Sequence, residues 1–286
     1  DRRQRQMCIR DRICAMRALV AYEEAQYLIS EHFIDTFTMG NRRTVVGLRD
    51  ASRHFEKNIL THAQVERIAA SCVGMLEDNR GYLYFGLILL MTTGITISEL
   101  CALTWGSFSF SKTYAGIIVV EIMAETKLVG DVYRIEELNG PRRRTIPLPP
   151  AVAKFYHRVR DNAPNIQENA PFMRSFKNAA RRIRPDEFDR WLKGFFKSFG
   201  FSKQPELKSL TKNPERTLRA TFRSALESCG CDADEIRYLY GSAPESVFAR
   251  NYCAYDDPRE LAKLAAVLDK YAISLTETPC DVSELS

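Results

Sequence analysis

The run from Gly81 to Thr93 contains almost no polar side chain and is followed directly by Gly94. It is too short to span a membrane, which takes roughly 20 apolar residues. It is also apolar on every side, unlike a helix that lies on a protein surface. We therefore predict a buried helix that Gly94 ends in the left-handed conformation. Other elements must pack around this helix.

The periodicity of apolar residues predicts those other elements. Helical spacing indicates several more helices, one of them opened by Thr61 with Gln64 as its capping-box partner. The predicted helices cover 13–37, 61–76, 98–103, 150–162, 172–183, 186–199, 216–229, 232–240, 244–255 and 258–271. Alternating and β-branched residues predict strands at 114–124, 132–136 and 143–148. The expected fold class is mainly α with a small antiparallel β-sheet (α+β).

Charge and cysteine content restrict the function only loosely. The 286 residues carry a formal net charge of +5, which permits nucleic-acid binding without requiring it. The eight cysteines form no CxxC pair, and no histidine follows them at zinc-ligand spacing. We interpret them as reduced thiols of a cytoplasmic protein, with a redox or metal role for Cys229 and Cys231 as the alternative. No signal peptide is visible.

The first part of the chain differs from the rest. Residues 1–12 read DRRQRQMCIRDR, show no apolar period, and resemble translated sequencing-adapter sequence rather than a folded segment. Residues 13–41 have a helical pattern, and residues 42–58 are polar and basic, which is typical of a linker. Residues 59–286 are predicted to form the main domain.

Four segments of this domain carry a motif signal. They are TTGITISEL at 92–100 with Leu103 and Trp105 after it, RTIPL at 144–148, RTLRATF at 216–222, and LYGS at 239–242 with Tyr252 after it. In this order they resemble the tyrosine recombinase (phage integrase) family, whose versions read TGLRISELxxLxW, RxIPL, HxLRHTF and LLGH followed by a tyrosine. The resemblance covers roughly residues 61–271. It implies that 59–286 is the catalytic domain and that 13–41 is a remnant of the helical core-binding domain.

The resemblance also implies a mechanism that uses neither metal nor cofactor. A tyrosine attacks the scissile phosphate and forms a phosphotyrosyl intermediate. Two arginines hold the charge of the transition state, and a lysine assisted by histidines protonates the leaving oxygen. Tyr252 falls at the nucleophile position and Arg219 at the second arginine. The other positions are altered: Thr96 replaces the first arginine, Leu138 (or Asn139) the lysine, and Arg216 and Ser242 the histidines.

Two basic clusters are candidates for contacts with DNA phosphates, and solvated surface charge is the alternative for both. The first is Arg142, Arg143 and Arg144, and the second is Lys177, Arg181 and Arg182. Glu99 is expected to orient nearby basic groups, and a role as general base is the alternative.

These residues predict a site-specific recombinase homologue that binds double-stranded DNA and whose strand cleavage is lost or strongly impaired. A non-catalytic DNA-binding accessory protein and a helical protein-interaction module are the alternatives. The expected partners are DNA and either further copies of the chain or an active recombinase, without a membrane. Residues 258–271 either exchange between copies or pack on their own domain. A bacterial, cytoplasmic location is expected.

Overall fold

The computed structural model describes residues 59–110, 117–163, 165–198, 208–243 and 257–274. These residues all belong to one structural unit, Lys57–Ser286. The predicted helices at 13–37 and 244–255, the linker at 42–58 and the candidate nucleophile Tyr252 lie outside the described residues.

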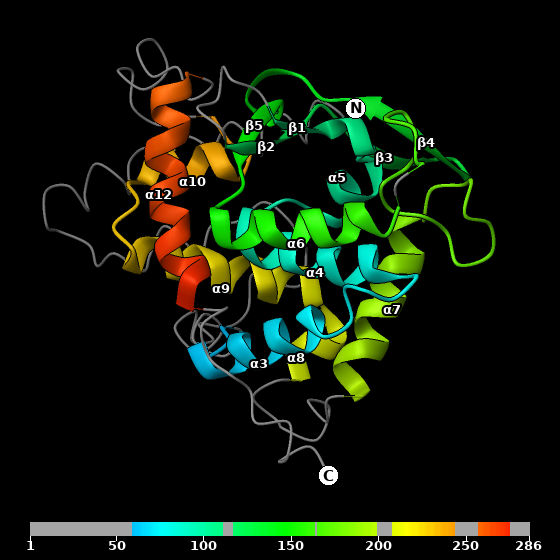
Figure 1. Ribbon diagram of the computed structural model, residues 1–286, viewed down its shortest axis with the longest axis horizontal. Coiled ribbons are helices and arrows are strands. Elements are labelled where there is room, and N and C mark those ends of the chain that lie inside the picture. Colours follow the sequence, from blue (N-terminus) through cyan, green and yellow to red (C-terminus); the bar gives the residue numbers. More distant parts are fainter. Residues whose placement is uncertain (1–58, 111–116, 164, 199–207, 244–256, 275–286) are drawn as a thin grey trace, which may run out of the picture. The chain divides into compact units, whose positions relative to one another are not determined.

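Helix α4 (Gly81–Thr93) lies at the centre of the core, as its sequence predicts. Every residue of α4 except Tyr84 is buried. Helices α3 (His62–Val73), α6 (Pro150–Asp161) and α9 (Pro214–Ser228) pack against it (Figure 1). Gly94 follows at a φ of 68°, which confirms the predicted left-handed end. The chain therefore turns sharply at this point toward the next helix.

The remaining described helices agree closely with the sequence pattern, apart from the short helix at 208–212, which was not predicted. They are α5 (Ile97–Ala102), α7 (Pro185–Ser198), α8 (Lys208–Lys212), α10 (Ala233–Leu239) and α12 (Pro258–Ser274), with 3-10 turns η3 (Trp105–Ser107) and η5 (Gly140–Arg142). The capping box predicted for Thr61 and Gln64 is present. Helix α12 packs against α6, α9 and strand β5 (Arg144–Pro147) of its own unit, which agrees with the second of the two alternatives for residues 258–271.

The helix predicted at 172–183 is wrong. This segment is a series of turns with an isolated bridge between Arg174 and Arg182. Local polar groups compete with helical bonding there, because the Asn178 side chain accepts the Ala180 N–H at 2.9 Å. Arg182 donates instead to carbonyls at the end of α5. Helical apolar spacing alone therefore misidentified an irregular segment.

The strands form two antiparallel sheets rather than one. Strands β1 (Phe108–Phe110), β2 (Ile118–Ile122) and β5 form a three-stranded sheet in the order β1-β2-β5. Strands β3 (Ala124–Val129) and β4 (Val132–Glu137) form a separate hairpin. The mainly helical class with small antiparallel sheets is confirmed. The sequence pattern missed β1, which is short, and β3, which carries the polar run Glu125-Thr126-Lys127.

None of the described helices is long and apolar enough to cross a membrane. The described cysteines Cys72, Cys101, Cys229 and Cys231 are free thiols. Burial raises the pKa of Cys231 to about 12, so its thiolate is strongly disfavoured near neutral pH. No group of three or more metal-ligating side chains occurs in the described ranges.

Candidate nucleic-acid interface

Helix α9 carries two of the arginines singled out by sequence. It begins at Pro214, directly after Asn213, because proline fits the first helical position, where no N–H is needed. Arg216 and Arg219 are three residues apart and therefore share one face of the helix. Both line a cleft of about 540 Å³, together with Asn213, Glu215 and, from α7, Asp189 and Lys193.

Arg219 is held from two directions. Its guanidinium carbon lies 4.8 Å from the centroid of the Tyr240 ring, and its Nη1 lies 3.8 Å from Glu215 Oε1. The side chain is still 21% exposed. Arg216 is exposed and has no ion pair among the described residues. The cleft thus offers one oriented and one unpaired guanidinium to an anion.

Thr96 acts as the N-cap of α5. Its Oγ1 accepts the Glu99 N–H at 3.1 Å, and Glu99 Oε2 accepts the Thr96 N–H at 2.8 Å. The adjacent Ile97 N–H donates to the Glu215 side chain, which connects this helix end to Arg219. The position where the resemblance places a catalytic arginine is therefore occupied by a short neutral side chain that caps a helix.

Glu99 and Arg144 form a buried ion pair behind this helix end. Arg144 Nη1 donates to Glu99 Oε1 at 2.9 Å and Nη2 donates to Oε2 at 3.0 Å. Arg144 Nε also donates to the Leu239 carbonyl at 2.9 Å. The two side chains are 3% exposed or less. The predicted orienting role of Glu99 is thus what the structure shows, with Arg144 as its partner.

Two carboxyl groups beside the site are shifted in opposite directions. Burial would raise the pKa of Glu99, but hydrogen bonds from Arg144, its positive charge and the Thr96 N–H outweigh burial and hold this pKa below its ordinary value. Burial raises the pKa of Glu215, and the charge of Arg219 and the Ile97 N–H only partly offset it. The ionised form of Glu99 is therefore favoured, whereas the ionised form of Glu215 is disfavoured relative to an ordinary carboxyl group.

The turn after α10 brings the chain against Arg144. Gly241 has a φ of 66°, and a Cβ there would lie 2.7 Å from Arg144 Nη1. The next residue, Ser242, is exposed, and its N–H donates to the Arg237 carbonyl at 2.8 Å. Ser242, at a histidine position of the resemblance, thus follows a residue in direct contact with the buried pair.

Leu138 belongs to the core and not to the cleft. Its side chain is 3% exposed, and its N–H donates to the Met123 carbonyl at 2.8 Å. Lys127, on strand β3, is exposed and pairs with Glu136 across the hairpin at 2.8 Å. An apolar buried side chain cannot donate a proton, so Leu138 supplies none of the chemistry of a lysine.

The hairpin arginines have three different environments. The guanidinium of Arg144 is fully buried, which corrects the expectation that it contacts phosphates together with its neighbours. Arg142 is exposed and pairs with Glu125 in bidentate fashion, and Arg143 is exposed with its Nε 2.9 Å from Met123 Sδ. Only Arg142 and Arg143 keep an accessible charge.

The second basic cluster divides in the same way. Lys177 and Arg181 are exposed. Arg182 Nη1 donates to the carbonyls of Ala102 and Leu103 at 2.6 and 2.7 Å, which ties it to the end of α5. The half-buried Arg182 is therefore tied to the fold by these bonds, and its contact with DNA stays a prediction.

The structure thus brings some candidates together and separates others. Arg216 and Arg219 share a cleft, and Thr96 is linked to it through Ile97 and Glu215. Lys193 and Asn213 also line the cleft and were not predicted. The Asn-Pro pair at 213–214 is a helix-start signal that would have placed Asn213 beside the arginines; no sequence signal singles out Lys193.

Of the comparisons with known proteins, only the one with solved structures identifies similar proteins. No family model matches the chain, and no curated protein matches it. The integrase of transposon Tn1549, solved as a fragment in complex with transposon right-end DNA, aligns with a TM-score of 0.51 and 21% identity over 73% of this chain. A second structure of that integrase, with circular-intermediate DNA, gives a TM-score of 0.49 and 22% identity over 72% of this chain.

This chain covers 66% of the first integrase fragment and 65% of the second, so it spans just under two thirds of their length. Helix order, the small antiparallel sheets and the structural alignment agree with one another. The described part of the chain therefore has the fold of the tyrosine-recombinase integrases.

Proposed function

We propose that this chain binds double-stranded DNA in the manner of a tyrosine recombinase and that its strand cleavage is lost or strongly impaired. The observation that carries the proposal is the cleft in which Arg216 and Arg219 lie together while Thr96 caps α5. Two guanidinium groups of α9, those of Arg216 and Arg219, bind the phosphate, whereas Thr96 replaces the first catalytic arginine.

The charges in the cleft fit a DNA phosphate. Lys193 pairs with Asp189 within α7, whereas Arg219 is 3.8 Å from Glu215, beyond hydrogen-bond length. A phosphate can take bidentate hydrogen bonds from Arg219 without breaking a tight ion pair. The raised pKa of Glu215 lowers the cost of neutralising this carboxyl when an anion approaches.

The same residues explain why cleavage should be weak. Loss of one phosphate clamp typically costs about a hundred- to a thousand-fold in rate. Replacement of the general acid by an apolar residue such as Leu138 removes a further factor on the order of a hundred. The two losses are not additive, but neither Thr96 nor Ser242 restores a positive charge. The chain is therefore expected to bind DNA rather than to cleave it. It would do so in a bacterial cytoplasm, either alone or together with an active recombinase.

Salt-dependent fluorescence anisotropy with a labelled duplex tests the binding. Each lost phosphate contact should reduce the magnitude of the slope of log affinity against log salt by about 0.9. We expect this reduction for Arg219→Gln and for Arg216→Gln. Arg223→Gln is the matched control, because Arg223 lies on the same helix, is exposed, and pairs with Glu227.

Equal slopes of log affinity against log salt for all three variants would show that the α9 cleft is not part of the DNA interface. An absence of duplex binding even at low salt would reject the DNA hypotheses altogether and favour the helical protein-interaction module.

A further inference from the structure

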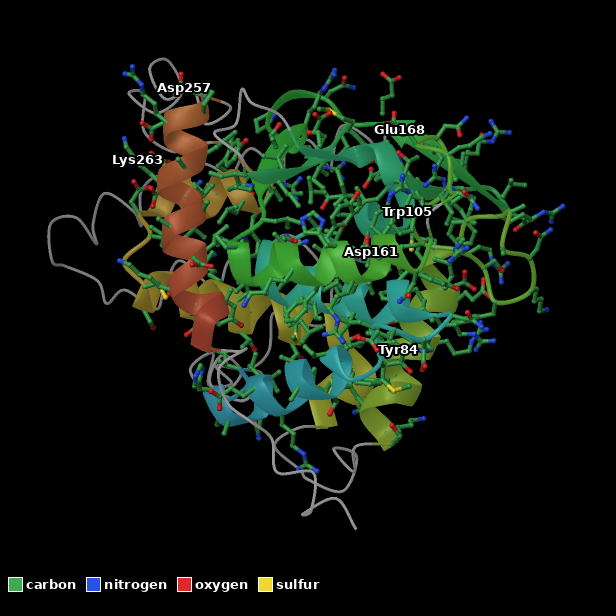
Figure 2. The ribbon with its side chains drawn as sticks, in the orientation of Figure 1. Tyr84, Trp105, Asp161, Glu168, Asp257 and Lys263 are labelled. Atoms are coloured by element: carbon green, nitrogen blue, oxygen red, sulfur yellow. The ribbon has the colours of Figure 1, made fainter. Side chains whose placement is uncertain are left out.

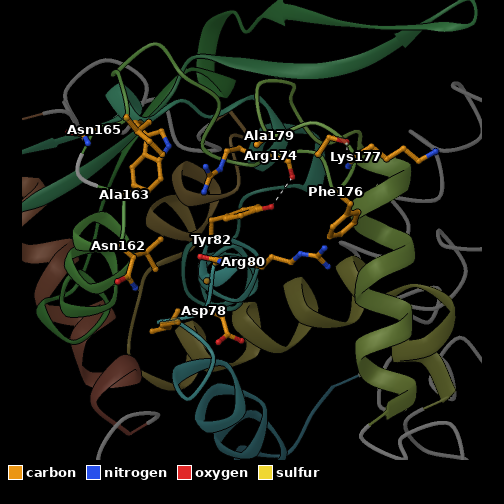
Figure 3. Close-up of a pocket in the computed structure, with 17 residues that line it drawn as sticks. Asp78, Arg80, Tyr82, Asn162, Ala163, Asn165, Arg174, Phe176, Lys177 and Ala179 are labelled. Carbon is orange, nitrogen blue, oxygen red and sulfur yellow. Dashed lines mark hydrogen bonds between the residues drawn. The ribbon is translucent and has the colours of Figure 1, made fainter.

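A second cavity, of about 530 Å³, lies apart from the α9 cleft. It is formed by the beginning of α4, by the end of α6 with residues 162, 163, 165 and 166, and by residues 174–177 and 179 (Figure 3). Helix α4 starts at this cavity and ends at Gly94, two residues before Thr96. The two sites are therefore separated by about the length of α4, roughly 18 Å at 1.5 Å per residue.

Two buried polar groups that line this cavity have no hydrogen-bond partner among the described residues. They are Trp105 Nε1 and Arg174 Nε. Trp105 is 2% exposed and lies inside the fold (Figure 2), with its ring 5.1 Å from that of Phe172. Both groups can only donate. A buried donor left unpaired is costly, so the group that completes it is an acceptor.

The charges around the cavity have the sign that attracts such an acceptor. Arg80, Arg174 and Lys177 line it against the single carboxylate of Asp78, and none of these cations has an ion pair in the described ranges. Arg174 extends across the Tyr82 ring toward the segment that carries Asn162 and Asn165, whereas Lys177 extends away (Figure 3).

The position of Arg174 is fixed by its surroundings. Its guanidinium carbon lies 4.8 Å from the centroid of the Tyr82 ring, and the Tyr82 hydroxyl donates to the Arg174 carbonyl at 3.2 Å. The N-cap residue of α4, Arg80, makes no side-chain capping bond, so the positive end of the helix dipole also faces this region. The positive charges, the helix dipole and the unpaired donors thus all favour an anionic acceptor in this cavity.

Part of the lining is apolar. Leu76, Val159, Ile166 and Phe176 form this part of the wall. The volume lies within the range of roughly 300–1,000 Å³ that is typical of small-molecule sites. An inorganic ion would leave these apolar side chains in contact with water, whereas an organic ligand would shield them from it.

We propose that this cavity binds a small organic anion. Its phosphate or carboxylate group accepts hydrogen bonds from Arg174 and from the Trp105 indole, and its remaining part lies against the apolar wall. This site does not depend on DNA binding by the α9 cleft.

The chain contains a built-in reporter for a test. It has two tryptophans, Trp105 and Trp191, and Trp191 lies on α7 among aromatic side chains outside the cavity lining. Trp191→Phe keeps an aromatic ring there and leaves Trp105 as the only tryptophan fluorophore. The protein with this substitution is titrated with AMP, citrate and inorganic phosphate, after circular dichroism confirms that it is folded.

We expect a saturable change in Trp105 emission with AMP or citrate, at least tenfold tighter than with inorganic phosphate. The tighter of the two identifies a phosphate or a carboxylate ligand. Arg174→Gln, which keeps the backbone carbonyl for Tyr82, should weaken binding at least tenfold. Arg190→Gln, at a 73% exposed arginine outside the cavity, should leave it within about twofold.

The absence of a saturable change with AMP or citrate up to about 10 mM would overturn the proposal, because the binding free energy would then be weaker than about −3 kcal/mol. So would equal affinity for inorganic phosphate, or an Arg174→Gln variant that binds like the parent. Displacement of AMP by a DNA duplex would assign the cavity to the DNA interface and also reject a separate site.

Discussion

Glu99 and Arg144 are joined by two parallel hydrogen bonds, of 2.9 and 3.0 Å, in the interior of the protein. This pair connects the beginning of α5 to strand β5, and through the Leu239 carbonyl to the end of α10. Three of the four motif segments therefore meet at one ion pair. Its role is to hold α5, β5 and α10 together.

Removal of one partner of this pair should destabilise the fold strongly. Glu99→Gln leaves the Arg144 charge buried without its counter-ion, and breaking such a pair typically costs about 3–5 kcal/mol. Urea denaturation measures the free energy of unfolding. Arg142→Ala, which breaks the exposed pair with Glu125, is the control and should cost about 1 kcal/mol or less. Similar losses for both variants would contradict the structural role.

The pH dependence of stability should follow the lowered pKa of Glu99. A carboxyl with a depressed pKa in the folded state stabilises the fold above its unfolded pKa, and this contribution is lost as pH falls through the folded pKa. We expect the Glu99→Gln variant to show a shallower loss of stability in acid than the parent. Identical acid profiles, measured by thermal unfolding at a series of pH values, would be the opposite result.

The contribution of Glu215 to the pH dependence of stability should have the opposite sign. Its pKa is raised, so the ionised form is the costly one in the folded state, and that cost is present above the folded pKa. Glu215→Gln should therefore stabilise the protein slightly at neutral pH and much less in acid. The side chain is about one third exposed, so the gain is small. A variant destabilised at neutral pH would contradict this expectation.

Gly241 should tolerate no side chain. Its φ is 66°, and a Cβ would lie 2.7 Å from Arg144 Nη1. Gly130 is the matched control, because its φ is 63° and a Cβ added there would meet no atom within 4 Å. Gly130→Ala should cost roughly 1–2 kcal/mol, the left-handed backbone penalty, and Gly241→Ala clearly more. Equal unfolding midpoints for the two variants would disprove the close approach.

Thr96 should matter for its hydroxyl and not for its methyl group. Thr96→Ala removes the oxygen that accepts the Glu99 N–H and should cost about 1 kcal/mol. Thr96→Ser keeps the oxygen and should be nearly neutral. If both substitutions had the same effect on stability, Thr96 would not be acting as a cap.

Most of the helices were predictable because their signals are local. Proline and glycine boundaries, capping boxes and apolar periodicity all act within a few residues, as at Thr61 and Gly94. The segment 172–183 could not be predicted in this way, because Arg182 bonds to carbonyls about 80 positions away in the sequence. The basic run 142–144 also shows this limit. Three adjacent arginines look equivalent in sequence, but only Arg144 lies in β5, where the Glu99 carboxylate and the Leu239 carbonyl hold its guanidinium in the interior.

The candidate site was predictable only in outline. Motif order indicated Thr96, Arg216 and Arg219, and the structure places the two arginines in one cleft. The ionic connections among α5, β5 and α9 depend on long-range contacts that no local pattern encodes. Tyr252 stays a prediction, because it lies outside the described residues.

The central claim is DNA binding with little or no cutting, and a nicked-duplex assay read in two ways tests it most directly. The protein is incubated with a library of duplexes that carry a nick, and each sample is run on a native gel and on a denaturing gel. We predict a salt-sensitive shifted complex on the native gel and no protein–DNA adduct on the denaturing gel. A covalent adduct that disappears in Tyr252→Phe but persists in Tyr255→Phe would contradict the account and establish an active recombinase.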